Sequence, residues 1–161
     1  MSNKLFPITV TVNGTIYHRE VEARMLLSDF LRHELGLLGT HVGCEHGICG
    51  ACTINFDGQA VRSCLMFAVQ ANGHEIQTVE SLGTPEKLHP LQESFTEKHA
   101  LQCGFCTPGF LMTLVPFLEE NPKPTDEEIR EAISGNICRC TGYEKIVEAV
   151  QDAADKLSQS K

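Results

Sequence analysis

The chain has 161 residues, a length that suits one ordinary globular domain or two small ones. Hydrophobic residues make up 42% of it, enough to form a globular core. Acidic residues outnumber basic ones by 21 to 13, and the formal net charge of −8 argues against nucleic acid and anionic membranes as partners. No apolar stretch is long enough to span a bilayer.

The first half of the chain is predicted to consist mainly of strands and turns. Residues 8–22 are expected to form a β-hairpin, because apolar side chains alternate along ITVTV and the Asn13-Gly14 pair favours a two-residue turn. Leucines and a phenylalanine at helical spacing predict one helix over residues 25–35. A glycine-rich loop follows, then a second hairpin that turns at Asp57-Gly58 and a last strand in residues 74–79.

The second half is predicted to be helical. Helices are expected at about residues 90–99, 107–120, 125–135 and 142–157. Pro90 suits the first turn of the first helix, and Thr125 with Glu128 forms the sequence pattern of a capping box. Pro116 lies inside the second helix, where we expect a kink.

These patterns predict an α+β protein with two domains. The β-rich domain is assigned to residues 1–80 and the helical domain to residues 81–161, with the transition in the segment VESLGTPEKLH. Each domain receives four of the eight cysteines, which is the first indication of two separate four-thiolate sites.

Eight cysteines in a chain of this composition need a chemical explanation. They are Cys44, Cys49, Cys52, Cys64, Cys103, Cys106, Cys138 and Cys140. The sequence shows neither a twin arginine nor a signal peptide, so we expect a cytoplasmic protein, in which disulfides are rare. Three of the spacings leave only one or two residues between cysteines, which is poor geometry for a local disulfide. Zinc sites and iron–sulfur sites are the remaining alternatives.

The first four cysteines follow the spacing of an iron–sulfur protein. Cys44, Cys49 and Cys52 form a C-x4-C-x2-C motif and Cys64 follows further on, which is the plant-type [2Fe–2S] pattern. Glycines within the loop let the backbone approach an anionic cluster and turn N–H groups toward it. A structural zinc site is the alternative, although zinc ribbons favour two C-x2-C pairs. His46 lies between two of these cysteines and is interpreted as a surface loop residue.

The second four cysteines form two short pairs, Cys103-x2-Cys106 and Cys138-x-Cys140. Each pair is followed directly by a threonine at the expected start of a helix, and both threonines are predicted N-caps. These predicted caps are Thr107 and Thr141. Helix N-termini carry partial positive charge and free N–H groups, so two converging N-termini favour an anionic cluster of thiolates. Tetrathiolate zinc would benefit from the same dipoles and stays an alternative for this group.

Three motifs, GCEHGICGACT, LQCGFCTPGF and GNICRCTGY, occur in this order in the two halves of the chain. In this order and spacing they resemble the small iron–sulfur subunit of the molybdenum hydroxylases, the family of xanthine oxidase and carbon monoxide dehydrogenase. The resemblance implies a plant-ferredoxin-like β-grasp domain followed by a four-helix bundle, each holding one [2Fe–2S] cluster. It also implies a large partner subunit with a molybdenum–pterin cofactor and a medium partner subunit with FAD, assembled as a dimer of heterotrimers.

The resemblance further implies roles for individual residues. The ligands of the cluster nearer FAD would be Cys44, Cys49, Cys52 and Cys64. The ligands of the cluster nearer molybdenum would be Cys103, Cys106, Cys138 and Cys140. Gln102 and Cys140 would contact the pterin of the partner subunit, where electrons arrive. Arg139 lies between two ligands, and two interpretations remain open: it tunes the cluster or pairs with a partner carboxylate, or it forms a structural salt bridge.

We therefore predict an electron-transfer subunit of a molybdenum-containing oxidoreductase, relaying electrons from molybdenum through two clusters to FAD. The chain is expected to have no catalytic residue and no substrate site of its own. The loop CEHGIC resembles that of family members with N-heteroaromatic or aldehyde-type substrates more than that of the carbon monoxide dehydrogenases, which implies such a substrate at the partner subunit. The alternatives are a carbon monoxide dehydrogenase small subunit and a free-standing two-cluster ferredoxin. Large exposed apolar faces would favour a subunit over a free-standing shuttle.

Overall fold

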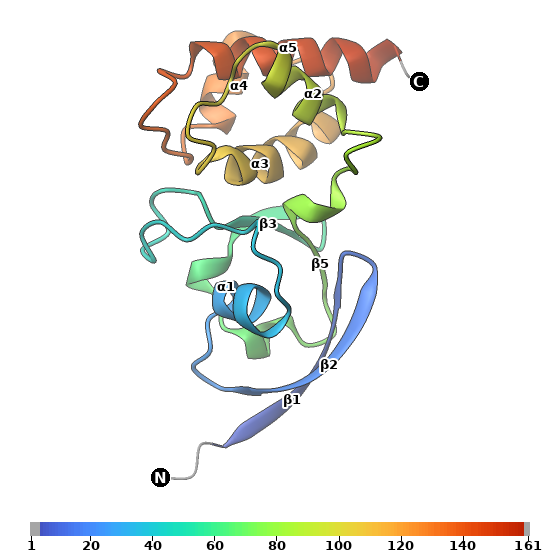
Figure 1. The fold of residues 1–161 in the computed structure, drawn as a ribbon, viewed down its shortest axis with the longest axis vertical. Coiled ribbons are helices and arrows are strands. Elements are labelled where there is room, and N and C mark those ends of the chain that lie inside the picture. Colours follow the sequence, from blue (N-terminus) through green and yellow to red (C-terminus); the bar gives the residue numbers. More distant parts are fainter. Residues whose placement is uncertain (1–3, 160–161) are drawn as a thin grey trace.

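The computed structural model describes residues 4–159 and has two parts stacked along its long axis (Figure 1). A β-sheet domain forms the lower part and four helices form the upper part. Each part has its own hydrophobic core, one built from residues 8–76 and the other from residues 91–154. The α+β fold is thus confirmed. The boundary between residues 80 and 81 stays a prediction, since Val79 already packs against the helical core; the outer bounds 1 and 161 lie outside the described residues.

The sheet contains β1 (Leu5–Val12), β2 (Thr15–Glu22), β3 (Thr53–Phe56), β4 (Gln59–Arg62) and β5 (Glu75–Gln77). Their order in space is β2-β1-β5-β3-β4. β1 pairs antiparallel with β2 and parallel with β5, and β3 is antiparallel to both β4 and β5, so the sheet is mixed as a β-grasp requires. Both predicted hairpin turns form, and all four of their central residues have positive φ.

The helix that covers this sheet is shorter than predicted. α1 (Leu27–Asp29) gives way to a π-helical turn, Phe30–Glu34, in which the amide of Leu35 donates to the carbonyl oxygen of Phe30. Phe30 and Leu31 are both fully buried in the core of the sheet domain. Gly36, with a φ of 71°, ends the segment.

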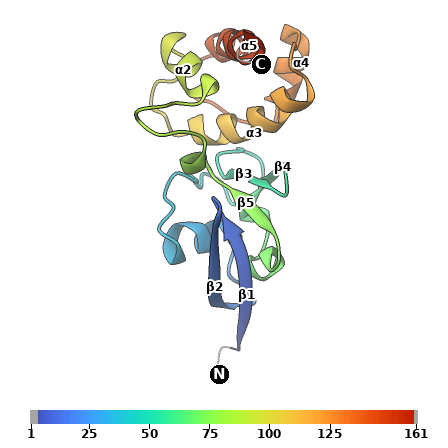
Figure 2. The ribbon, with the colours of Figure 1, turned by 90° about the vertical axis from the view of Figure 1, so that its right-hand side faces the viewer.

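The helical domain contains α2 (Pro90–Glu97), α3 (Thr107–Glu120), α4 (Asp126–Ala132) and α5 (Glu144–Gln159). α2 and α4 lie on either side of α5, and α3 lies beneath them against β3 (Figure 2). The predicted capping box at α4 is confirmed, because the amide of Thr125 donates to Glu128 and the amide of Glu128 donates to Thr125. None of the helices between residues 4 and 159 is long and apolar enough to cross a membrane.

The structure corrects both predicted threonine caps. Thr107 is the first residue of α3, and the N-cap is Cys106, without a capping bond from its side chain. α5 begins at Glu144 rather than near residue 142, because Gly142 and Tyr143 adopt left-handed conformations that precede the helix. Pro116 is buried inside α3; the kink there stays a prediction.

Candidate functional site: two groups of cysteines

The first cysteine group lies in the loop between α1 and β3, and its fourth member comes from the turn after β4. Backbone amides point at the sulfur of Cys44, since the N–H groups of His46 and Cys49 both donate to it across 3.4 Å. The hydrogen bonds from Cys49 and His46 lower the pKa of the Cys44 thiol to about 6. Within the group, Cys44 interacts with Cys49, and Cys52 interacts with Cys64.

Other thiols of this group respond to burial. Cys64 is only 4% exposed, and burial raises the pKa of its thiol to about 11. Burial also raises the pKa of Cys49. A bound metal cation compensates such a desolvation penalty, because it binds the deprotonated form of each thiol.

Two glycines shape the loop around these thiols. Gly47 has a φ of +75°, and a Cβ at this position would lie 2.4 Å from the side chain of Leu65. Gly50 has a φ of +73°, and its Cβ would lie 2.5 Å from the carbonyl oxygen of Gly135.

The second cysteine group joins the start of α3 to the loop before α5. The sulfur of Cys140 lies 3.5 Å from that of Cys103, and both residues are exposed. The buried Cys138 interacts with Cys106, and burial raises the pKa of the Cys106 thiol to about 12. The four cysteines thus form two pairs, as in the first group.

Thr141 serves this group as a donor to sulfur. Its hydroxyl donates to the sulfur of Cys138 across 3.1 Å and its amide across 3.4 Å. Burial acts to raise the pKa of the Cys138 thiol, but the hydrogen bonds from Thr141 and the amide of Cys140 outweigh it and lower that pKa. The amide of Cys138 itself donates to the hydroxyl of Tyr143 across 2.8 Å.

This donor set suits a cluster of two metal ions with two thiolates on each. Two thiolates on one tetrahedral metal lie about 3.7 Å apart when the metal–sulfur bonds are about 2.3 Å, close to the separation of Cys103 and Cys140. All eight cysteines are free of disulfides. N–H and O–H donors to sulfur, as at Cys44 and Cys138, support the negative charge of an iron–sulfur cluster. Within residues 4–159, no group of three or more His, Cys, Asp or Glu side chains is arranged to hold a single metal ion.

A backbone hydrogen bond joins the two groups. The amide of Ile137, next to Cys138, donates to the carbonyl oxygen of Cys49 across 2.9 Å. Nearby, His41 stacks on Phe105 with 4.9 Å between ring centroids and contacts its carbonyl oxygen through Nδ1 at 2.7 Å. The sequence carried no signal for these contacts, because their partners lie more than 60 residues apart.

Three further residues singled out in the sequence lie at the surface. Gln102 lies beside Cys140, and its side-chain amide donates to the Cys140 carbonyl oxygen across 3.0 Å. His46 is exposed, as expected for a loop residue. Arg139 is also exposed, and among residues 4–159 it has no ion-pair partner, so the structural salt bridge is not found there.

Comparison with protein families assigns a cluster to each domain. Residues 10–78 match the model of a 2Fe-2S iron-sulfur cluster binding domain, and residues 78–151 match that of a [2Fe-2S] binding domain. Both families bind [2Fe–2S] clusters, so the iron–sulfur interpretation is favoured over zinc in both halves of the chain.

Similar proteins are subunits of larger enzymes. The chain is 61% identical over 149 residues to the 6-hydroxypseudooxynicotine dehydrogenase complex subunit beta of Paenarthrobacter nicotinovorans, covering 92% of this chain and 93% of that protein. It is 59% identical to the caffeine dehydrogenase subunit gamma of Pseudomonas sp. (strain CBB1), covering 91% and 90%. A chain of the quinoline 2-oxidoreductase structure from Pseudomonas putida 86 superimposes with a TM-score of 0.93 at 52% identity, covering 98% of both chains. The chain thus belongs to the family of small [2Fe–2S] iron–sulfur subunits of the molybdenum hydroxylases.

Proposed function

We propose that this chain relays electrons inside a molybdenum hydroxylase that oxidises an N-heteroaromatic compound. The observation that carries the proposal is the hydrogen bond from the Ile137 amide to the Cys49 carbonyl oxygen. It links Cys49, a member of the first cysteine group, to Ile137, which directly precedes Cys138 of the second group. Two redox centres joined by so short a covalent and hydrogen-bonded route are suited to exchange electrons within one chain.

We propose the eight cysteines as the ligands of two [2Fe–2S] clusters, which supply one-electron redox chemistry when bound. In the helical domain, Cys103 and Cys140 would share one iron and Cys106 and Cys138 the other, as their pairwise contacts suggest. In the β domain the corresponding pairs are Cys44 with Cys49 and Cys52 with Cys64.

Electrons are proposed to arrive at the helical domain, from the molybdenum–pterin cofactor of a large partner subunit. Cys103 and Cys140 are the exposed members of their group, so this edge is open to a partner. Gln102 uses one N–H on the Cys140 carbonyl oxygen. Its other N–H and its carbonyl oxygen remain to bind polar edges of a pterin ring.

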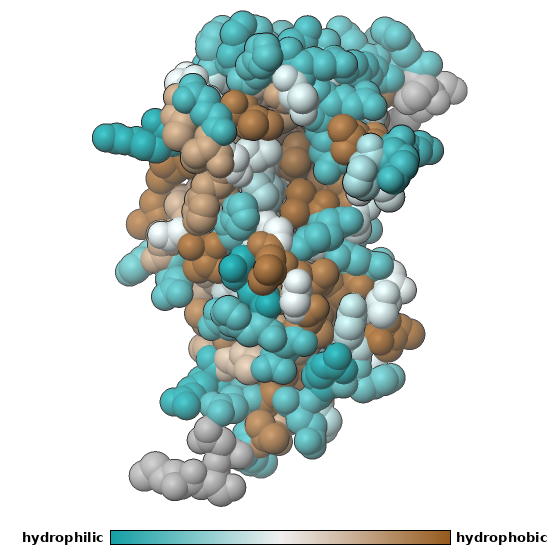
Figure 3. Space-filling view, in the orientation of Figure 1, coloured by the Kyte–Doolittle hydropathy of each residue, from teal (hydrophilic) through white to brown (hydrophobic). Residues whose placement is uncertain are grey.

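Electrons are proposed to leave from the β domain to FAD in a medium partner subunit. Two large apolar side chains flank the cysteine loops there: Ile48 is 66% exposed and Leu65 is 61% exposed. Hydrophobic residues also gather along the edge formed by the loop after α1 and the loops before α3 and α5 (Figure 3). This distribution favours a subunit over a free-standing ferredoxin. We also propose that the three subunits assemble as a dimer of heterotrimers. The proposed location is the cytoplasm, where these free thiols stay reduced.

The substrate class is proposed from the similar proteins. The nicotine derivative, caffeine and quinoline in their names all contain a nitrogen heteroaromatic ring. We therefore favour such a ring over an aldehyde as the substrate of the complete enzyme.

Purification of the chain through an affinity tag from its native host tests the proposal. We expect molybdenum and FAD to co-purify, and the complex to hydroxylate quinoline or a pyridine derivative with a dye as electron acceptor. Aldehyde oxidation without heteroaromatic hydroxylation would contradict the substrate class. A chain that accumulates alone, without molybdenum or flavin, would contradict the relay.

A further inference from the structure

Arg62, the last residue of β4, connects the two domains through both arms of its guanidinium group. Nη1 donates to the hydroxyl oxygen of Thr53 in β3 across 2.5 Å. Nη2 donates to the carbonyl oxygen of Gly135, in the loop after α4, across 2.7 Å. The side chain is half-buried. A planar group with fixed donors sets the relative position of two acceptors, which a single hydrogen bond does not.

The contacts of Arg62 continue into a buried network. The hydroxyl of Thr53 donates a hydrogen bond to the carbonyl oxygen of Gly50 across 2.6 Å. The same oxygen accepts a hydrogen bond of 3.2 Å from Nδ2 of Asn136, whose side chain is only 2% exposed. The hydroxyl of Thr113 lies 3.0 Å from Oδ1 of Asn136 and 2.9 Å from the carbonyl oxygen of Gly109, and it shares its one proton between these two acceptors. Each of these polar groups is satisfied, so the network specifies one arrangement.

This network surrounds the hydrogen bond between the cysteine groups. Gly50 directly follows Cys49, and Asn136 directly precedes Ile137. Each residue of the Ile137–Cys49 hydrogen bond is therefore adjacent in sequence to a residue that is fixed by the network.

The packing here brings backbone against backbone. A Cβ on Gly109 would lie 2.3 Å from the carbonyl oxygen of Gly50, and one on Gly135 would lie 2.6 Å from Nη2 of Arg62. Backbone carbonyls that are buried at such a contact need donors, or they cost free energy. Arg62 donates to the Gly135 carbonyl oxygen on one side of the contact. It also orients the Thr53 hydroxyl, which donates to the Gly50 carbonyl oxygen on the other side.

We infer that Arg62 is a positioning residue for electron transfer between the two clusters: its two hydrogen bonds keep the Cys49 carbonyl and the Ile137 amide in contact. The inference rests on the proposed ligands and on the proposed relay. Arg62 itself touches none of the eight cysteines through a hydrogen bond among the described residues.

Arg62 could act through its positive charge alone, and a lysine separates the two accounts. Arg62→Lys keeps the charge but cannot reach Thr53 and Gly135 with a planar fork. Arg62→Gln removes the charge as well. Arg24→Gln is the matched control, because Arg24 lies in the same domain, is largely exposed and pairs with Glu22 on the surface.

The experiment compares these variants in the complex purified with its partners. Iron content and EPR spectra first establish that both clusters are present. Two measurements then follow the inference: the magnetic interaction between the two reduced clusters, and hydrogen exchange of the peptide that contains the Ile137 amide. For Arg62→Gln and Arg62→Lys we expect a weaker magnetic interaction and exchange about tenfold or more faster. Arg24→Gln should match the wild type in both.

Each outcome has a definite meaning. Wild-type values in Arg62→Lys but not in Arg62→Gln would show that charge alone matters and would overturn the inference, as would wild-type values in both. If the Arg62 variants do not assemble, Thr113→Val removes the hydroxyl that donates to Asn136 and to the Gly109 carbonyl oxygen, and should produce the same change to a smaller degree. Unchanged values there would also overturn the inference. A wild-type complex with a single [2Fe–2S] signal would instead contradict the proposed function.

Discussion

The hydroxyl of Thr141 donates a hydrogen bond to the sulfur of Cys138 across 3.1 Å, and the Thr141 amide approaches the same sulfur at 3.4 Å. The threonine after the C-x-C pair thus stabilises negative charge on a proposed ligand. Adding an electron makes a cluster more negative, so a donor to sulfur stabilises the reduced state and raises the reduction potential.

Thr141→Val removes this hydroxyl with little change in shape. We predict that the potential of the helical-domain cluster falls by about 20–60 mV, the equivalent of one ordinary hydrogen bond for a one-electron couple. The β-domain cluster should keep its potential. Redox titration followed by EPR measures both, and Thr141→Ser, which retains a hydroxyl, serves as the control. An equal fall in both potentials would contradict a local effect.

Replacing one cysteine in each domain should remove one cluster at a time. Cys106→Ala is predicted to abolish the EPR signal of the helical-domain cluster and to halve the iron content, while the other signal remains. Cys52→Ala should have the converse effect. Loss of both signals from either variant would show that the eight cysteines do not divide into independent groups.

Most of the secondary structure could be predicted from patterns among neighbouring residues. Contacts between residues distant in sequence could not be predicted. The turns at Asn13-Gly14 and Asp57-Gly58 and the capping box at Thr125 depend on neighbouring residues, and all three form. The predicted caps at Thr107 and Thr141 were wrong. Thr107 already lies inside α3, whose N-cap is Cys106, and two residues with positive φ separate Thr141 from the start of α5.

The candidate site shows the same limit. Cysteine spacing was enough to group the eight thiols into two sets of four. The contact of Arg62 with Gly135 spans 73 residues and that of Asn136 with Gly50 spans 86, so neither leaves a periodic or short-range pattern. The packing of α3 against β3 and β4 brings the two domains together here.

Gly109→Ala tests this packing. The new Cβ would lie 2.3 Å from the carbonyl oxygen of Gly50, and backbone on both sides cannot yield without moving the domains apart. We predict a loss of about 1–3 kcal/mol in unfolding free energy, as for overpacked cores, and a weaker magnetic interaction between the clusters. Gly73→Ala is the control: Gly73 has a φ of +85°, which is unfavourable for alanine, but outside its chain neighbours no atom lies within 4 Å of its Cβ. It should lose stability without changing the interaction between the clusters.

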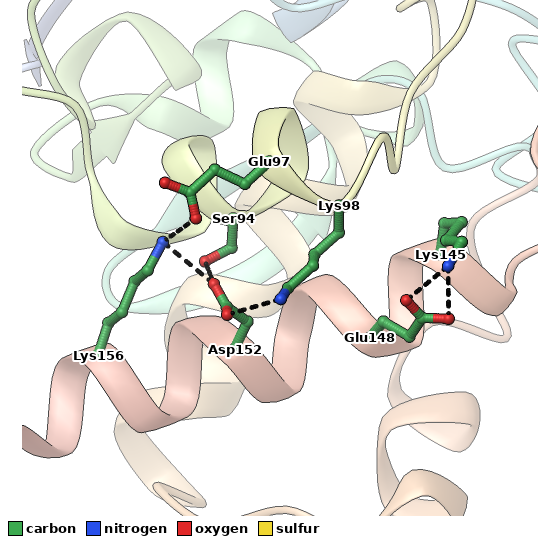
Figure 4. Close-up of polar contacts among 7 residues, drawn as sticks. All are labelled: Ser94, Glu97, Lys98, Lys145, Glu148, Asp152 and Lys156. Carbon is green, nitrogen blue, oxygen red and sulfur yellow. Dashed lines mark hydrogen bonds and ion pairs between the residues drawn. The ribbon is translucent and has the colours of Figure 1, made fainter.

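Asp152 ties α5 to α2 through the contacts shown in Figure 4. Ser94 donates to its carboxylate across 2.7 Å, and Lys98 and Lys156 approach it at 3.0 Å. The Ser94 hydroxyl and the two lysines lower the pKa of Asp152 to about 2. Since this lies below the unfolded value of about 3.9, the contribution to stability is present above about pH 4 and is lost as pH falls through about 2.

We therefore predict that Asp152→Asn lowers the unfolding free energy at pH 7 by about 1–2 kcal/mol, after allowance for solvent screening. The difference from wild type should shrink between pH 4 and pH 2, as measured by urea unfolding. Glu148→Gln is the control, since Glu148 pairs with Lys145 on the surface of α5 (Figure 4). A difference for Asp152→Asn that does not depend on pH would exclude the charge as its cause.

Gln102→Ala tests the place where electrons arrive. The substitution removes the hydrogen bond to the Cys140 carbonyl oxygen and the groups proposed to bind the pterin. We predict slower reduction of both clusters by substrate, by about tenfold as for the loss of one or two hydrogen bonds, with unchanged reduction by dithionite. Stopped-flow absorbance at the cluster bands measures both rates. Slower reduction by dithionite as well would indicate damage to the cluster itself.

The proposed relay requires two clusters in one chain that act in sequence between two partners. Freeze-quenched EPR of the purified complex, after mixing with an N-heteroaromatic substrate, examines this. We predict two distinct [2Fe–2S] signals in the wild-type complex. The signal of the helical-domain cluster, which Cys106→Ala abolishes, should already be present at the earliest times. In the Cys106→Ala complex, substrate should not reduce the flavin. A single [2Fe–2S] signal, or flavin reduction by substrate at the wild-type rate in Cys106→Ala, would contradict the relay.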